Sequence, residues 1–161
     1  MKKNFAILIL IFGIIFFTPA GKAKAINLTA VGSWSRSITS DDLAAGAGSE
    51  LKGDYESAVD AVSIDISATA GASDSWRIDV KKVDANWHGD FILYIKRTSN
   101  GTGGSISGGI VYQEVTNNST SFFSGSDDVS GIKAQLKLSG VLIQIPVDTY
   151  TTTVYYTVVD I

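Results

Sequence analysis

One histidine is the only residue in the sequence whose side chain has an unperturbed pKa close to neutral pH. His88 lies in the segment Asn86–Asp90, whose residue types are typical of a turn. A serine hydrolase would also need a serine that the histidine activates as the nucleophile. The G-x-S-x-G elbow that often carries such a serine does not occur in the sequence. We therefore interpret His88 as a solvated turn residue and expect the protein not to be an enzyme.

Two pairs of adjacent carboxylates offer a second kind of chemistry. Asp41-Asp42 and Asp127-Asp128 have the groups used by glycosidases and by calcium sites. Neither pair stands in a D-x-[DN]-x-[DN]-G loop, and adjacent acids in a turn usually face water. The sequence has no cysteine, which excludes thiol catalysis, zinc-cysteine sites, redox chemistry and disulfides. We expect no metal site and no cofactor.

Three tryptophans suggest carbohydrate binding, because flat aromatic faces pack against sugar rings. Trp76 alternates in phase with the apolar residues that follow it, which predicts a place in the core. Trp34 and Trp87 lie among serines and in a turn, so they are candidates for a glycan surface, together with Tyr55 or Tyr112. Packing into the core is the competing interpretation for both tryptophans.

Strands are the elements that would position these residues. Apolar and polar residues alternate with a period of two, and β-branched and aromatic types dominate, in four segments: 62–69, 76–81, 91–96 and 132–138. Clusters of Gly, Ser, Asn and Asp predict turns between them at 71–75, 86–90, 99–105, 116–119 and 124–128. The one helical candidate is Asp41–Ala47, capped by Ser40, and we expect one turn there at most. These patterns predict an all-β fold with a single domain, an antiparallel sandwich or barrel.

The first 25 residues have the pattern of a cleavable signal peptide. Lys2 and Lys3 precede an apolar run from Phe5 to Phe17, and small residues at Ala23 and Ala25 fit a cleavage site. The run is shorter than the roughly 20 residues that span a bilayer, so we expect a signal and no membrane anchor in the mature chain. The prediction is a secreted protein, located outside the cell, at its surface or in the periplasm.

Residues 26–161 fit one domain with a real core. Four of the thirteen basic residues are lysines of the leader, so this domain holds nine basic against sixteen acidic residues. An acidic surface argues against nucleic acid and anionic lipid as partners.

Both ends of the mature chain are predicted to be strands. At the start, one face would carry Ile26, Leu28, Ala30, Gly32 and Trp34. The chain closes with Tyr150–Ile161. Within it Tyr150–Val158, which follows the apolar stretch Val141–Pro146, resembles the last strands of bacterial fimbrial subunits and of secreted proteins of the spore coat protein U type. The resemblance implies a single antiparallel immunoglobulin-like β-sandwich, which is the fold we expect, and a first strand that is lent to a neighbouring subunit to complete its sandwich. Many members of those families have a disulfide, which this chain lacks.

Three functions therefore compete. The favoured one is a structural or adhesive cell-surface subunit, such as a subunit of a pilus-like fibre, whose partners are copies of itself or other surface subunits. The second is a secreted carbohydrate-binding module with a glycan as its ligand. The third is a small exported hydrolase that uses His88. An N-terminal strand kept in its own sheet is the alternative to a lent strand, and it would make a self-contained monomer.

Overall fold

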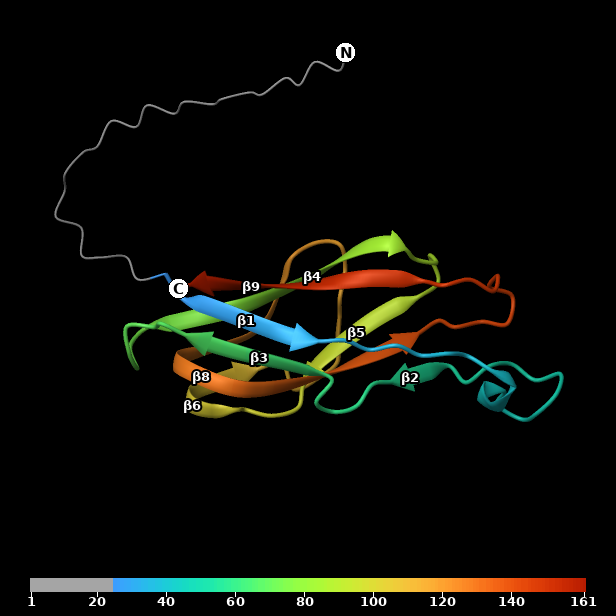
Figure 1. The fold of residues 1–161 in the computed structure, drawn as a ribbon, viewed down its shortest axis with the longest axis horizontal. Helices are drawn as coiled ribbons and strands as arrows, with labels where there is room; N and C mark the ends of the chain where they lie inside the picture. The colour runs from blue at the N-terminus through green and yellow to red at the C-terminus, as the bar shows by residue number, and fades with distance from the viewer. Residues whose placement is uncertain (1–24) are drawn as a thin grey trace, which may run out of the picture.

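A computed structural model describes residues 25–161, so the predicted leader lies outside the described residues except for Ala25. Strands dominate this part of the chain, and one short 3-10 helix accompanies them (Figure 1). The nine strands are β1 (Asn27–Gly32), β2 (Asp54–Glu56), β3 (Val62–Ser67), β4 (Ser75–Asn86), β5 (Ile92–Arg97), β6 (Thr102–Gly108), β7 (Gln113–Glu114), β8 (Thr120–Ser139) and β9 (Thr151–Asp160). The all-β prediction is confirmed.

All nine strands belong to one hydrogen-bonded sheet whose main path runs β1-β3-β8-β4-β9. The long strand β8 is its centre, because β2, β3, β4, β5 and β6 each pair with it in antiparallel fashion. Its first half pairs with β4 and β6, and its second half with β3, β5 and β2. Figure 1 shows β8 curving strongly between these halves. Asp127 and Gly131 in the curve have positive φ, a conformation that Gly and Asp tolerate better than most residues.

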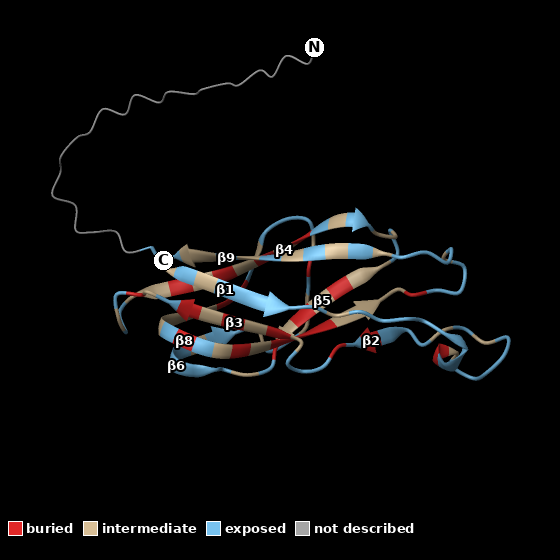
Figure 2. Cartoon of the chain, in the orientation of Figure 1, coloured by how far each residue is buried: buried red, intermediate tan, exposed pale blue. Residues whose placement is uncertain are grey.

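The core lies inside this curved sheet, as the buried faces in Figure 2 show. The predicted alternation is confirmed in β3, β4 and β5, where every second residue is buried. Trp76 is fully buried, as the sequence pattern predicts, and its ring meets Phe123 edge to face with centroids 6.1 Å apart. Its indole Nε1 donates a hydrogen bond to the Asp127 carbonyl at 2.9 Å, so the one polar atom of the ring is satisfied.

The prediction of turns at 99–105 and 124–128 is wrong over most of both segments. They form β6 and the first half of β8, which pair with each other. Close backbone approach explains their small residues: a Cβ on Gly104 would lie 1.9 Å from the Ser126 carbonyl oxygen, and one on Gly125 would lie 2.6 Å from the Trp76 ring. The same glycines that suggest turns in the sequence are what lets these strands come together.

One further prediction, that of the helical turn, needs correction. The helical turn is Ser40–Asp42, capped by Thr39, so it lies earlier and is shorter than the predicted segment 41–47. Thr39 is the cap instead of Ser40, because Asp42 lies three residues after Thr39 and completes a capping box with it. The apolar stretch 141–146 is not a strand but part of the loop that connects β8 to β9, with Leu142 and Ile143 exposed.

The sheet is nearly closed, and one seam stays open. In the described chain, β1 pairs with β3 alone and β9 pairs with β4 alone, although β1 and β9 are in contact. Their arrows point in opposite directions in Figure 1, and the C-terminus lies beside the start of β1. Each therefore has one edge without a strand partner, and the two edges flank the seam.

Candidate functional site

An apolar groove of about 1350 Å³ follows the seam. We call it the seam groove. One wall runs from Leu28 in β1 through the segment Ser33–Ser40, and the opposite wall runs from the loop 141–150 into β9 as far as Tyr156. Asn27, the one residue of β1 before Leu28, and residues 157–160 of β9 do not border it. Its volume exceeds the roughly 300–1,000 Å³ of ordinary ligand pockets.

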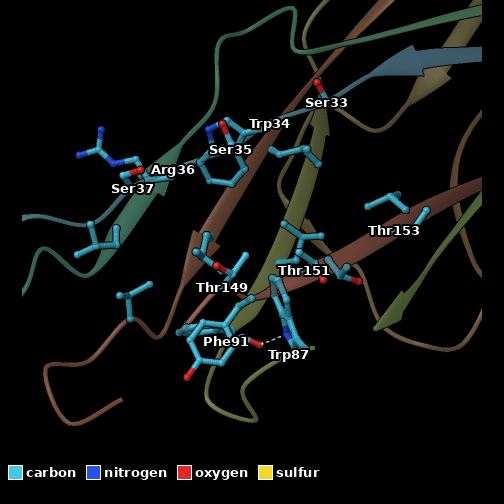
Figure 3. Close-up of a pocket in the computed structure, with 18 of the residues that line it drawn as sticks. Ser33, Trp34, Ser35, Arg36, Ser37, Trp87, Phe91, Thr149, Thr151 and Thr153 are labelled. Carbon is cyan, nitrogen blue, oxygen red and sulfur yellow. Dashed lines mark hydrogen bonds between the residues drawn. The ribbon is translucent and has the colours of Figure 1, made fainter. Parts of the chain in front are cut away.

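Aromatic rings gather at the wide end of the groove, where β4 turns into β5. Phe91 lies between Trp87 and Tyr150, with centroid distances of 5.4 and 5.0 Å, and both ring pairs are T-shaped. Trp87 Nε1 donates to the Phe91 carbonyl at 3.1 Å, which fixes the indole in the turn. Trp34 borders the same groove from the opposite wall (Figure 3). The structure therefore brings together the two tryptophans that the sequence singles out.

Hydroxyl groups follow both sides of the groove. Ser33, Ser35 and Ser37 alternate with Trp34 and Arg36 in the segment after β1, and Figure 3 shows threonines on the other side. These threonines are Thr149, Thr151 and Thr153. All six residues are exposed. Among the described residues, none of the six side-chain hydroxyls has a hydrogen-bond partner, so all six are available to a ligand.

The groove carries little free charge. Arg36 borders it, but its guanidinium pairs with the buried carboxylate of Asp42. That carboxylate also accepts the Thr39 N–H at 2.9 Å, and this bond together with Arg36 lowers the pKa of Asp42 although its burial acts the other way. Asp148, on the opposite wall, accepts hydrogen bonds from the Asn86 amide and from the N–H of Thr149. The described lining residues therefore offer no free cation to an acidic ligand.

Tyr156 of β9 carries an unsatisfied polar atom at the narrow end of the groove. Its hydroxyl is buried and has no hydrogen-bond partner among residues 25–161. Burial also raises the pKa of Tyr156. A buried hydroxyl without a partner costs stability, so this side chain is either a cost of the fold or a donor for something that enters the groove.

The two tyrosines named with the tryptophans lie elsewhere. Tyr55 is 6% exposed and packs with the Arg36 guanidinium 5.3 Å from its ring centroid, so it belongs to the core. Tyr112 lies between lysines, with Lys96 Nζ at 4.3 Å and Lys137 Nζ at 4.9 Å from its ring centroid. Neither tyrosine borders the seam groove.

The predicted assembly strand lies in its own sheet. β1 pairs with β3 in continuous register from Asn27↔Ser67 to Gly32↔Val62. Ile26, Leu28 and Trp34 pack against the core, as their shared face predicts, whereas Ala30 and Gly32 on that face are exposed. β1 is thus bonded along one edge and only partly covered.

The residues considered for catalysis and metal binding are engaged in packing and hydrogen bonds within the fold. His88 is half-buried against Phe91 and Tyr150, and its Nδ1 lies 3.7 Å from an Asp90 carboxylate oxygen. Asp42 is buried rather than facing water, and the Asp128 carboxylate accepts both the N–H and the hydroxyl of Thr69, at 2.9 and 2.7 Å. Residues 25–161 contain no cluster of three or more His, Cys, Asp or Glu arranged to hold a metal ion.

Phe91, Tyr150 and Tyr156 are groove residues that the sequence interpretation did not select. Phe91 and Tyr150 each stand beside a turn, as Trp87 does, so aromatic residues next to turns are the signal that would have found them. No helix of residues 25–161 is long and apolar enough to cross a membrane. The chain matches no protein-family model, no curated protein and no solved structure.

Proposed function

We propose that this chain is a secreted structural or adhesive subunit of the cell surface that joins its neighbours by exchanging β1. The export pattern of residues 1–25 supports the location, and the strongly curved β8 supports an immunoglobulin-like sandwich with strands on both of its halves. The observation that carries the proposal is the attachment of β1, which is bonded to β3 alone and faces the open seam.

Exchange of β1 should have a small free-energy cost in this arrangement. β1 can leave β3 without disturbing any other strand pair, and Val31, which is 65% exposed, shows how little of it is covered. Ser33, directly after β1, is exposed and can serve as the hinge, so Trp34 keeps its place against the core. Pairing β1 with the β3 of a neighbour restores the same hydrogen bonds, so the net cost is limited to hinge strain and to the entropy of association. A head-to-tail exchange of this kind builds a fibre.

Paired cysteines test the exchange directly, because the chain has none of its own. Asn27 and Ser67 are opposite one another and both exposed, so the double variant Asn27→Cys with Ser67→Cys can form a disulfide across β1 and β3. Exported, oxidised protein should give a ladder of covalent multimers on a non-reducing gel. Pairing Asn27→Cys with Ser63→Cys is the matched control, because Ser63 lies four residues away along β3 and is out of reach. Disulfide-linked monomers alone, at every concentration, would contradict strand exchange.

A second candidate function is carbohydrate binding, favoured by the meeting of Trp34 and Trp87 in the seam groove. It is compatible with the first, because exchange of β1 leaves the wide end of the groove in place. An adhesive subunit needs both a way to assemble and a way to bind.

A further inference from the structure

We infer that the wide end of the seam groove binds a single chain of a neutral oligosaccharide. This inference rests on the carbohydrate-binding candidate above and names its ligand, but it does not depend on whether β1 is exchanged. Three features of the groove carry it: the aromatic residues, the free hydroxyls and the lack of a free cation among its described lining residues.

The aromatic residues come from segments far apart in the sequence and meet only in the folded groove. Trp34 follows β1, Trp87 and Phe91 flank the turn between β4 and β5, and Tyr150 precedes β9. Both tryptophans are half-buried, so each is held by the fold and still presents part of its ring. Apolar ring surface of this kind packs against the C–H faces of sugars.

The hydroxyls supply the polar half of the recognition. A sugar ring carries several hydroxyl groups, and each is best matched by a group that both donates and accepts, as Ser and Thr do. Thr151 and Thr153 are two residues apart in β9, which places them about 7 Å apart along the groove. Ser33, Ser35 and Ser37 continue the same chemistry on the other wall (Figure 3). The rows of hydroxyls extend past one sugar ring, so the ligand is an oligosaccharide rather than a monosaccharide.

The charges and the ring geometry of the groove restrict the class of oligosaccharide that it can bind. Arg36 is occupied by Asp42, and Asp148 by Asn86, so an acidic sugar would find no free cation in the groove. Trp87, Phe91 and Tyr150 meet edge to face and do not form a flat platform. A flat array of aromatic rings suits the surface of a crystalline polysaccharide, whereas a groove with rings at several angles suits one isolated chain.

The experiment titrates the mature protein with four neutral hexasaccharides: cellohexaose, xylohexaose, mannohexaose and chitohexaose. Isothermal calorimetry measures affinity, and quenching of tryptophan fluorescence reports on the groove. We expect at least one of the four to saturate a single site. Trp34→Ala and Trp87→Ala should each weaken binding about tenfold, a loss of about 1.4 kcal/mol. The double variant Thr151→Val with Thr153→Val, which removes two hydroxyls and keeps the strand, should weaken it about tenfold as well.

Tyr112→Ala is the matched control, because it removes an aromatic ring outside the groove and should leave affinity unchanged. Circular dichroism of every variant confirms that a loss of binding is not a loss of folding, and the threonine variants preserve the test if a tryptophan variant fails to fold. The inference is overturned if none of the four hexasaccharides binds, or if folded tryptophan and threonine variants bind as well as wild type. Multimer formation by the Asn27–Ser67 cysteine variant is measured separately, so failure of one proposal leaves the other standing.

Discussion

Removal of the Tyr156 hydroxyl should stabilise the protein. This hydroxyl is buried and has no hydrogen-bond partner among the described residues, so the folded state leaves unmet a bond that water provides in the unfolded state. Such a buried, unsatisfied group costs about 1–3 kcal/mol. Tyr156→Phe keeps the ring that packs against the core and deletes only the oxygen. We expect the free energy of unfolding to rise by about 1–2 kcal/mol, which corresponds to a Tm increase of about 3–8 °C for a domain of this size.

Tyr150→Phe is the matched control and should change stability in the opposite direction. The Tyr150 hydroxyl donates to the Pro146 carbonyl at 2.8 Å, so its deletion removes a formed bond on the surface and should cost up to about 1 kcal/mol. Urea unfolding of the three proteins, followed by circular dichroism, measures both changes. Destabilisation by Tyr156→Phe would refute the reasoning, because it would mean that the hydroxyl already has a partner in solution.

The same tyrosine predicts the alkaline behaviour of the protein. Burial raises the pKa of Tyr156 above the value of about 10 that it has in the unfolded chain. Above pH 10 the folded state therefore holds a proton that the unfolded state releases, and the free energy of unfolding falls as pH rises. Tyr156→Phe should lose this contribution, so its stability should decline less steeply than that of wild type above pH 10. Equal slopes for the two proteins would show that Tyr156 ionises in the folded state as easily as in the unfolded chain.

Three further predictions concern the frame around the groove. Gly125→Ala should destabilise the fold by about 3 kcal/mol or more, because its Cβ would lie 2.6 Å from the Trp76 ring. The control Gly53→Ala has open space around it and should change stability by less than about 1 kcal/mol. Thermal unfolding of the two variants measures the difference. Asp42→Asn should remove part of the acid sensitivity, since the lowered pKa of Asp42 makes its stabilisation present above pH 4 and lost below it; an unchanged acid unfolding curve would count against this role. Arg97→Lys should cost about 1–3 kcal/mol in urea, because a lysine cannot reproduce the fork that reaches the carbonyls of residues 99 and 108.

The sequence predicts those strands whose two faces differ. In β3, β4 and β5 the large apolar side chains mark the buried face, so period two is visible. β6 carries a single large apolar residue, Ile106, and the first half of β8 contains Gly125 among serines, so no face can be recognised there. β6 and the first half of β8 pair because their backbones can approach closely. This approach depends on the partner strand and is not visible in the apolar–polar pattern of either strand.

In the candidate site, too, some features can be predicted from the sequence and others depend on the fold. Trp34 and Trp87 can be selected as single residues, because aromatic side chains beside turns are informative by themselves. Their meeting in one groove with Tyr150 depends on how the curved sheet brings its two ends together. Tyr55 illustrates the reverse case, since its neighbours in the sequence are polar but the fold buries it beneath Arg36. Proximity across the seam is a property of the fold that a local pattern does not contain.

The central position of β8 has a consequence for the order in which the protein folds. β8 begins at Thr120, after three quarters of the chain, and the five strands β2 to β6 all pair with it. A chain that has not yet emerged beyond this point can form the β1–β3 and β5–β7 pairs but has no sheet in which to bury them. Because such non-local pairing is slow, the polypeptide should stay extended during synthesis. The export that we propose would require the chain to pass a translocation channel in that state, and the late synthesis of the central strand favours it.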